Sequence, residues 1–261
     1  MKIHNSHILI TGSNRGIGLA LAKAAALRKA HLHLVVRQED KHIVQELLNL
    51  GASSVQVWIA DLQNPQSVEE LTNKLKTLPI DILINNAGLL TGGLLETQTK
   101  EEIAHMFQVN VVSLVELTRA LLPNMIKRKN GKIVNNASVS ALMHFPGAST
   151  YAASKAAVWA FTNCLNIELS GTGVSTLTLI TPGVKTRMFD DIEKKYGTFL
   201  EVPQDHIPAD VFADQVMSAI ESDQDFLYPT IGLTRFGLWI SQLLPKVFKG
   251  AVRSKFNRNS A

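Results

Sequence analysis

The chain has 261 residues, 46% of them hydrophobic and 18% charged, with a formal net charge of +4 at pH 7. This length and apolar content predict one large α/β domain. The single cysteine, Cys164, excludes an internal disulfide and a cysteine-based metal cluster, and it fits a reducing compartment.

The chain enters a predicted strand close to its first residue. Ile8–Ile10 is a short apolar run that predicts a buried strand. No basic region followed by an apolar region precedes it, so we expect no secretory signal. No apolar run reaches the roughly 18–20 residues needed to span a bilayer, so we expect a cytoplasmic protein.

A glycine-rich turn follows this strand. Residues 11–18 are T-G-S-N-R-G-I-G, and Leu19–Leu27 predicts a helix. This layout holds a dinucleotide pyrophosphate, because glycines permit close backbone approach and the helix N-terminus attracts the anion. Taken alone the motif leaves open an ordinary strand-to-helix turn. The candidate cofactor contacts here are Gly12, Ser13, Asn14, Arg15, Gly16, Ile17 and Gly18.

The second predicted strand, Leu32–Val36, ends without an acidic residue. NAD-selective folds place an acid at this point to bond the ribose 2′-hydroxyl. Here Arg37 follows the strand and Arg15 lies in the glycine turn, and guanidinium groups suit a 2′-phosphate. We therefore expect NADP(H) rather than NAD(H). The alternative is that both arginines are only solvated, and Glu39 and Asp40 nearby favour it.

Four further strands alternate with longer helical patterns. The strands are predicted at Val55–Ile59, Ile80–Ile84, Lys132–Asn135 and Val174–Ile180. The clearest helical patterns cover 101–127 and 150–169. Such alternation predicts an α/β fold with a parallel sheet covered on both faces. Ligands then bind beyond the carboxyl ends of the strands.

Polar and turn-forming residues follow several of these strands, and we expect them to share one site. They are Asp61, Asn85–Gly88, Ser138 and Pro182. Asp61 could instead cap the next helix, and Asn85–Gly88 could be only a turn. Asn110 lies within a long predicted helix between apolar neighbours, where asparagine is a poor helix former.

Ser138, Tyr151 and Lys155 form the most informative set. Positions i and i+4 share one face of a helix, so Tyr151 and Lys155 can converge. A nearby ammonium favours phenolate, so we expect Lys155 to lower the pKa of Tyr151. Such a phenol can give or take a proton at a substrate oxygen that Ser138 holds. This chemistry requires a hydride partner, which a dinucleotide bound at the glycine turn would supply.

Together these motifs resemble the short-chain dehydrogenase/reductase family over roughly residues 5–230. The matching segments are T-G-x-x-x-G-x-G at 11–18, N-N-A-G at 85–88, Asn110, Ser138, Y-x-x-x-K at 151–155 and P-G at 182–183. The resemblance implies a single-domain, three-layer Rossmann-type doubly wound sheet, usually of seven parallel strands. It also implies hydride transfer between NAD(P) and a small-molecule alcohol or carbonyl substrate, in a homodimer or homotetramer.

The resemblance also implies residue roles. Ser138 would bind the substrate oxygen, Tyr151 would exchange its proton, and Lys155 would hold the nicotinamide ribose. Asn110 would position a water that links Lys155 to solvent. Thr186 would contact the nicotinamide, although it lies one residue nearer Pro182 than is usual in the family. The other implied cofactor contacts are Asp61, Leu62, Asn86, Ala87, Gly88, Val109, Tyr151, Lys155, Pro182, Gly183 and Val184.

A second class of function is a cofactor-binding sensor or scaffold without turnover, since fold alone does not decide function. The complete Asn110, Ser138, Tyr151 and Lys155 set favours turnover. We expect residues 1–230 to form the catalytic domain, with a substrate lid at about 187–210. The lid is rich in apolar residues, which favours a hydrophobic substrate without naming it. Its large apolar residues are Met188, Phe189, Tyr196, Phe199 and Leu200.

The C-terminal tail, 231–261, carries the positive charge of the chain. Six of the 26 basic residues and none of the 22 acidic ones lie in 230–261, which leaves 20 basic and 22 acidic residues elsewhere. The basic residues of the tail are interleaved with Trp, Phe and Leu. This pattern predicts an amphipathic segment on an anionic membrane surface. An amphipathic helix that packs on the domain or on a partner subunit is equally open. No nucleic-acid-recognition motif accompanies the charge, so we expect no nucleic acid partner.

Overall fold

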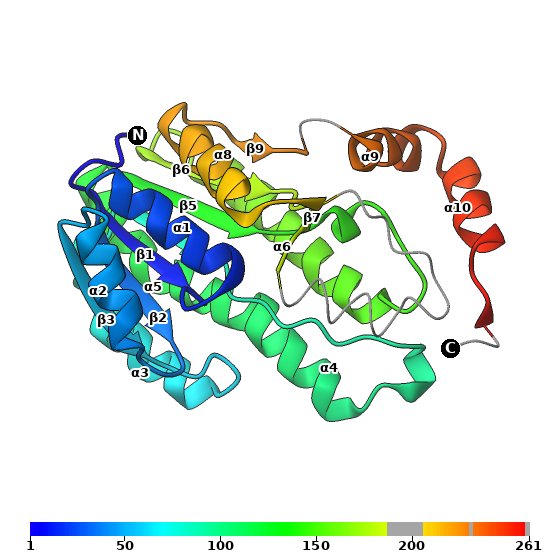
Figure 1. Ribbon diagram of the computed structural model, residues 1–261, viewed down its shortest axis with the longest axis horizontal. Coiled ribbons are helices and arrows are strands. Elements are labelled where there is room, and N and C mark those ends of the chain that lie inside the picture. Colours follow the sequence, from blue (N-terminus) through cyan, green and yellow to red (C-terminus); the bar gives the residue numbers. More distant parts are fainter. Residues whose placement is uncertain (187–205, 230–231, 259–261) are drawn as a thin grey trace.

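The computed structural model describes residues 1–186, 206–229 and 232–258. A seven-stranded parallel sheet runs through it in the order β3-β2-β1-β4-β5-β6-β9 (Figure 1). Its strands are β1 (His7–Thr11), β2 (His31–Val36), β3 (Ser54–Ile59), β4 (Ile82–Asn85), β5 (Gly131–Asn136), β6 (Val174–Leu179) and β9 (Phe226–Leu227). The chain order reverses between β1 and β4, and open α/β sheets bind ligands at such a reversal.

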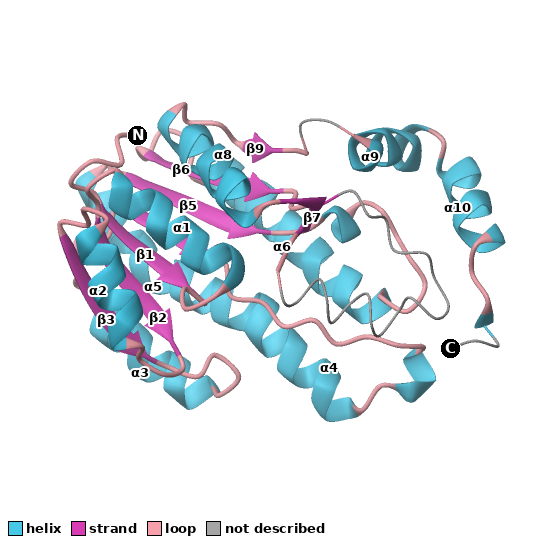
Figure 2. Ribbon diagram, in the orientation of Figure 1, coloured by secondary structure: helices cyan, strands magenta, loops and turns pink. Residues whose placement is uncertain are grey.

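Helices cover both faces of the sheet (Figure 2). In chain order, the helices of the described residues are α1 (Gly16–Leu27), α2 (Lys41–Asn49), α3 (Pro65–Leu75), α4 (Lys100–Phe107), η2 (Gln108–Val112), α5 (Ser113–Arg128), α6 (Ser149–Glu168), α8 (Ala209–Glu221), α9 (Leu233–Leu243) and α10 (Pro245–Ser254). The last two, α9 and α10, lie beyond the sheet (Figure 1). Short single turns lie at η1 (Leu95–Thr97) and η3 (Val139–Ala141).

The alternating side chains of the strands assign each helix to a layer. Ile8 and Ile10 of β1 face the core that α1, α2 and α8 cover. Leu9, between them, faces the opposite core, under α3, α5 and α6. Successive side chains of a strand point to opposite faces, so one strand contributes side chains to both cores. The predicted three-layer, Rossmann-type doubly wound sheet is confirmed.

Polar side chains begin several of the helices. The Asp40 carboxylate caps α2, and Asn64 caps α3 with Pro65 in the first turn. Thr99 and Glu102 form a reciprocal capping box at the start of α4. These caps satisfy backbone N–H groups that have no partner within a helix. The sequence had allowed Asp61 as the cap of this helix; in the structure, Asn64 is the residue that caps α3.

The elements from α4 to α5 form one continuous helix of 29 residues, Lys100–Arg128, that is long and apolar enough to cross a membrane by length and composition alone. The sequence predicted no such helix, because no uninterrupted apolar run reaches the roughly 18–20 residues needed to span a bilayer. Leu117, Leu121 and Met125 of this helix are buried in the core below the sheet. These side chains therefore serve the packing of the fold.

The structure describes only the last part of the predicted substrate lid. Of the predicted lid at about 187–210, residues 187–205 lie outside the described residues. The following β8 (His206–Ile207) pairs in parallel with β7 (Gly183–Val184), just after the Pro182 turn. α9 and α10 lie at the end of the molecule opposite α2 and β3 (Figure 1).

One buried lysine links β5, inside the sheet, to the loop that precedes the edge strand β9. Lys132 of β5 is fully buried, and its Nζ lies 2.7 Å from Asp223 Oδ1 and 2.9 Å from the Gln224 carbonyl oxygen. The hydrogen bond from Lys132 lowers the pKa of Asp223. This carboxylate therefore adds stability at neutral pH, which is lost as the pH falls through its lowered pKa.

We predict that Asp223→Asn lowers the unfolding free energy by about 1–2 kcal/mol at pH 7, an estimate reduced for solvent screening of the exposed carboxylate. Asparagine tolerates the left-handed backbone at Asp223, where φ is 53°. Urea denaturation at pH 7 and pH 3 measures the effect, with exposed Glu69→Gln as control. The difference from wild type should shrink at pH 3; a constant difference would rule out the ion pair as its source.

Candidate active site

The glycine turn between β1 and α1 is shaped for close approach. Gly12 and Gly16 have φ of +66° and +55°, a region that suits glycine. A Cβ added at Gly18 would lie 2.1 Å from the Gly12 carbonyl oxygen, so no larger residue fits there. The Ser13 hydroxyl is buried and has no hydrogen-bond partner among the described residues. These features fit a turn whose backbone and Ser13 receive phosphate groups.

A ladder of side-chain hydrogen bonds crosses the carboxyl ends of four strands. Asn86 Nδ2, after β4, donates to the Thr11 carbonyl oxygen of β1 at 3.0 Å. Asn136 Nδ2, at the end of β5, donates to Asn86 Oδ1 at 3.2 Å. The Thr181 hydroxyl, after β6, donates to Asn136 Oδ1. The glycine turn and the Pro182 turn are thereby held in one frame.

Thr11 completes this frame from the side of β1. Its hydroxyl accepts hydrogen bonds from the backbone N–H groups of Asn86 and Ala87, at 3.0 and 2.9 Å. A Cβ added at Gly12 would lie 3.0 Å from the Ala87 Cα. The predicted Asn86–Gly88 turn therefore packs directly against the glycine turn, as expected of two parts of one site.

Asn110 lies where the long helix changes its winding. Residues Gln108–Val112 form a π-helical turn between α4 and α5. The Asn110 amide bridges elements: Oδ1 accepts from Leu89 N–H at 2.8 Å, and Nδ2 donates to the Leu89 carbonyl oxygen and to Ser154 Oγ. π-Helical turns occur frequently at functional sites.

Lys155 and Gly88 meet at Asn110. A Cβ added at Gly88 would lie 3.7 Å from both Asn110 Oδ1 and Lys155 Nζ. Lys155 Nζ donates to the Asn136 carbonyl oxygen at 2.7 Å. The predicted lysine and asparagine thus come together, and Lys155 also joins the hydrogen-bond ladder.

Ser138 and Tyr151 come together through their side chains. Ser138 is nearly buried and extended, and its hydroxyl accepts from Ser140 N–H at 3.2 Å and lies 2.7 Å from Ser140 Oγ. Burial raises the pKa of Tyr151 to about 12, and a hydrogen bond with the Ser138 side chain opposes that rise.

The prediction that Lys155 lowers the pKa of Tyr151 is therefore wrong for this structure. Lys155 Nζ lies 5.9 Å from the centre of the Tyr151 ring and points to Asn136. Burial also lowers the pKa of Lys155 itself to about 8. Removal from water disfavours the charged form of both groups.

The other predicted cofactor residues occupy the same edge of the sheet. Asp61 is exposed after β3, with its carboxylate accepting from Gln63 N–H at 3.0 Å. Leu62 and Val109 are buried in the core under α3 and α5. In the Pro182 turn, the Thr186 methyl group lies 3.4 Å from a Cβ added at Gly16, so this turn reaches the glycine turn. Pro182 and Gly183 are partly buried and Val184 is buried.

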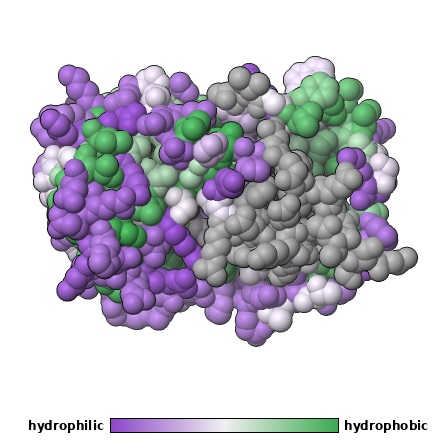
Figure 3. Space-filling model, viewed as in Figure 1, coloured by the Kyte–Doolittle hydropathy of each residue, from purple (hydrophilic) through white to green (hydrophobic). Residues whose placement is uncertain are grey.

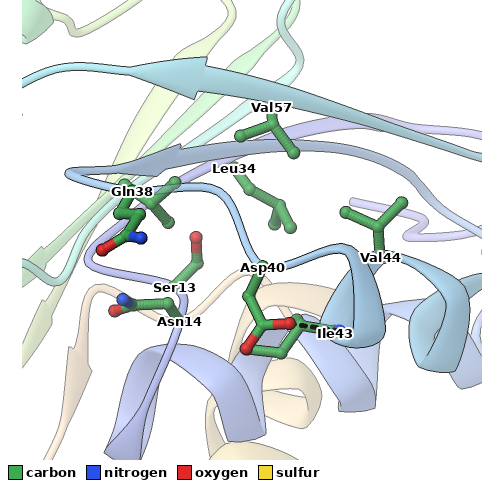
Figure 4. A pocket seen from close by; sticks show the side chains of 9 residues that line it. Ser13, Asn14, Leu34, Gln38, Asp40, Ile43, Val44 and Val57 are labelled. Carbon is green, nitrogen blue, oxygen red and sulfur yellow. Dashed lines mark hydrogen bonds between the residues drawn. The ribbon is translucent and has the colours of Figure 1, made fainter.

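A small pocket opens beside the glycine turn (Figure 4). Ser13 and Asn14 line one side, Leu34 and Val57 of the sheet line another, and Asp40 lies at the start of α2. Other lining residues are Val36, Gln38, Ile43 and Val44. The Asp40 carboxylate accepts from the N–H groups of His42 and Ile43, at 2.9 and 3.4 Å. Arg15 and Arg37 are both exposed at this end of the site.

Sequence reasoning missed four polar residues that hold the site together. They are Asn136, Ser140, Ser154 and Thr181. Asn136 and Thr181 come directly after predicted strands, which is the signal that identified Ser138 and Pro182. Applied to every strand end, that signal would have found both.

Comparisons with known proteins agree with this geometry. A family model described as "short chain dehydrogenase" matches residues 6–197. The ketoacyl reductase HetN of Nostoc sp. is 33% identical over 180 residues, covering 67% of this chain and 62% of that protein. A fatty acyl-CoA reductase of Acinetobacter baylyi is 35% identical over 185 residues, covering 69% of this chain and 63% of that protein. The matches thus span less than two thirds of both relatives.

Among solved structures, a short-chain dehydrogenase from Sphingobium yanoikuyae in complex with NADPH superposes with a TM-score of 0.80 and 26% identity, covering 98% of both chains. The family match covers most of this chain, and the motif residues meet at one edge of the expected sheet. The protein therefore belongs to the short-chain dehydrogenase family and is an oxidoreductase that acts on CH–OH or C=O groups with NAD(P).

Proposed function

We propose that this oxidoreductase uses NADPH to reduce a hydrophobic carbonyl compound, with Asn110, Ser138, Tyr151 and Lys155 as its catalytic set. The observation that carries the proposal is the pairing of a protonated Tyr151 with Ser138 beside Lys155. A phenol with a pKa near 12 keeps its proton at neutral pH. It is therefore ready to donate to the oxygen of a carbonyl group that is being reduced.

The chain's own residues fit a bound dinucleotide. The glycine turn, with the open backbone at Gly12 and the buried Ser13 hydroxyl, would hold the pyrophosphate. Residues on both sides of this turn would hold the remainder. They are Asp61 and Leu62 at the adenine, Asn86, Ala87, Gly88 and Val109 beside the nicotinamide ribose, and Pro182, Gly183, Val184 and Thr186 at the nicotinamide. When bound, the cofactor supplies the hydride.

Charge at the glycine turn supports NADP(H) over NAD(H). Arg15 and Arg37 are exposed there, and guanidinium groups bind phosphate through paired hydrogen bonds. Of the two acids that weakened this argument in the sequence, Glu39 and Asp40, the second accepts two backbone hydrogen bonds at the start of α2. Capping α2 therefore explains the presence of Asp40, and no contact with the ribose 2′-hydroxyl of NAD is needed to account for it. The similar Sphingobium dehydrogenase is described as a complex with NADPH.

The proton leaves Tyr151 and has to be replaced from solvent. In this proposal Ser138 holds the substrate oxygen, and Tyr151 donates its proton to that oxygen. Lys155, with a pKa near 8, carries a proton at neutral pH and can return it through a water beside the Asn110 amide. Asn110 is held from two sides, by Leu89 and Ser154, so its position is fixed.

Apolar side chains near the site support a hydrophobic substrate. Met143 is buried and Phe145 packs in the same cluster, both between Ser138 and Tyr151 in the chain. His144, between them in the chain, is exposed. The two curated relatives are named for ketoacyl and fatty acyl-CoA substrates, which supports a carbonyl compound with an acyl chain.

The wider organisation is part of the same proposal. Residues 1–230 form the catalytic domain and 231–261 the tail; most of the lid expected at about 187–210 lies outside the described residues. The protein works in the cytoplasm as a homodimer or homotetramer. Val112 of η2, Ile126 of α5 and Ile167 of α6 are exposed apolar side chains, which supports a subunit interface on that helical layer.

We predict that Tyr151→Phe lowers turnover of a carbonyl panel by about 100- to 10,000-fold, because the proton is lost and the ring is kept. NADPH binding, followed by fluorescence titration, should stay within a few-fold of wild type. Tyr228→Phe, at an exposed tyrosine outside the site, is the control. Near wild-type turnover of Tyr151→Phe would exclude this mechanism. A wild-type protein that binds NADPH and turns over no member of the panel would favour the sensor alternative.

The pH dependence of reduction follows from Lys155. We expect kcat/KM for reduction to fall as the pH rises through about 8, because Lys155 loses the proton that it returns to Tyr151. Tyr151, with a pKa near 12, should add no second decline below pH 10. Steady-state rates from pH 6 to 10 measure the profile. A flat profile would contradict the proposed proton route.

Cofactor choice is tested at the two arginines. We predict that Arg15→Ala and Arg37→Ala each raise KM for NADPH by about 10- to 100-fold, because a charge-assisted contact with the 2′-phosphate is lost. KM for NADH should not change, since NADH lacks that phosphate. Arg119→Ala, at an exposed arginine of α5, is the control. Equal changes for both cofactors would show that the arginines do not select the phosphate.

A further inference from the structure

The C-terminal helices expose an unusual amount of apolar surface. Fifteen large hydrophobic side chains are exposed among the described residues, and six of them lie in the stretch 233–247. These six side chains, which we call the tail patch, are Leu233, Phe236, Trp239, Leu243, Leu244 and Val247, with exposed fractions of 48–75%. Figure 3 shows a hydrophobic area over the position of α9. Concentrated apolar surface of this kind marks an interaction site.

The opposite side of these helices already packs on the protein. Leu238 of α9 is buried with Met143 and Val158, and the Phe248 ring of α10 meets Phe145 at 5.8 Å. Gln242 Nε2 donates to the Leu142 carbonyl oxygen at 3.0 Å. The tail thus packs on its own domain, which was one of the two alternatives in the sequence. That packing leaves the tail patch uncovered, so packing alone does not explain it.

The patch lies on one face of α9 and continues across the turn into α10. Phe236, Trp239 and Leu243 recur at helical spacing, so they form one stripe. Leu244 and Val247 extend it past the turn. Phe236 and Trp239 stack with ring centres 6.3 Å apart. Aromatic rings with an apolar body are favoured at the boundary between lipid headgroups and acyl chains.

Positive charge accompanies the patch. Lys246, Lys249 and Arg253 of α10 are exposed and share one helical face. No acidic residue occurs in 230–261 to balance them. A two-fold interface between two copies of this surface would place like charges close together, which opposes self-association. Anionic headgroups offer the complementary charge, together with an apolar layer for the patch.

We propose that the outer face of α9 and α10 docks on the surface of an anionic lipid bilayer. The tail patch enters the headgroup boundary, while the basic residues of α10 bind lipid phosphates. The helices lie in the plane of the surface and do not span it.

Docking would also place the bilayer beside the active site. The inner face of the two helices contacts Leu142, Met143 and Phe145, in the segment that joins Ser138 to Tyr151. A hydrophobic carbonyl compound dissolved in the membrane would then be close to the catalytic set. This consequence rests on the proposed function, whereas docking itself does not.

Vesicle co-sedimentation of the full chain tests the proposal. We expect the protein to sediment with vesicles of equal parts phosphatidylcholine and phosphatidylglycerol, and to stay in solution with phosphatidylcholine alone. The triple variant Lys246→Gln/Lys249→Gln/Arg253→Gln should bind on the order of 100-fold more weakly, given the contribution of each basic residue near such a surface. Replacing three exposed lysines elsewhere, Lys74→Gln/Lys100→Gln/Lys127→Gln, keeps the same net charge as a matched control.

The apolar contribution is tested separately. Phe236→Ser/Trp239→Ser/Leu243→Ser should abolish sedimentation, while Leu27→Ser/Leu95→Ser/Val211→Ser, at exposed apolar side chains elsewhere, should not. Turnover of a water-soluble carbonyl compound should be unchanged in all four variants, which separates docking from catalysis. Absence of vesicle binding by the wild type, equal losses in the matched controls, or a dimer that only the tail-patch variant dissociates would overturn the proposal.

Discussion

The site depends on polar side chains that bond to each other across the ends of parallel strands. Asn86, Asn136 and Thr181 link the ends of β1, β4, β5 and β6, and Lys155 joins through the Asn136 carbonyl oxygen. Leaving a buried amide without hydrogen-bond partners is costly. These side chains are therefore held in the one arrangement in which each finds its partners. The glycine turn, Lys155 and the Pro182 turn therefore keep fixed relative positions.

Burial sets the protonation of the site more strongly than charge does. Tyr151 and Lys155 were expected to favour each other's charged forms. In the structure, both are pushed toward neutrality, with pKa values of about 12 and 8. A neutral phenol beside a lysine that titrates close to neutrality is suited to giving protons and regaining them. The same burial that positions the two groups thus also sets the protonation state of each near neutral pH.

The sequence predicted the six longer strands of the sheet almost to the residue, because buried parallel strands are short apolar runs. It also predicted which residues meet at the sheet edge. It did not reveal β9, a strand of two residues, or the roles of Asn136 and Thr181, whose bonds cross between distant segments. The sequence could not predict the direction of the Tyr151 pKa shift, because that shift depends on how completely the folded protein excludes water from the side chain. The tail allowed two interpretations, because an amphipathic pattern shows which face is apolar and does not identify its partner.

The π-helical turn at Gln108–Val112 has a geometric consequence for the long helix that contains it. A π turn accommodates one residue more than an α turn, which shifts the faces of all later residues by roughly 100°. α5 can therefore bury Leu117 and Leu121 under the sheet while Asn110 faces the Leu89 backbone. The helix works as two segments with different rotational phases, and the single inserted residue allows one segment to serve the core and the other the site.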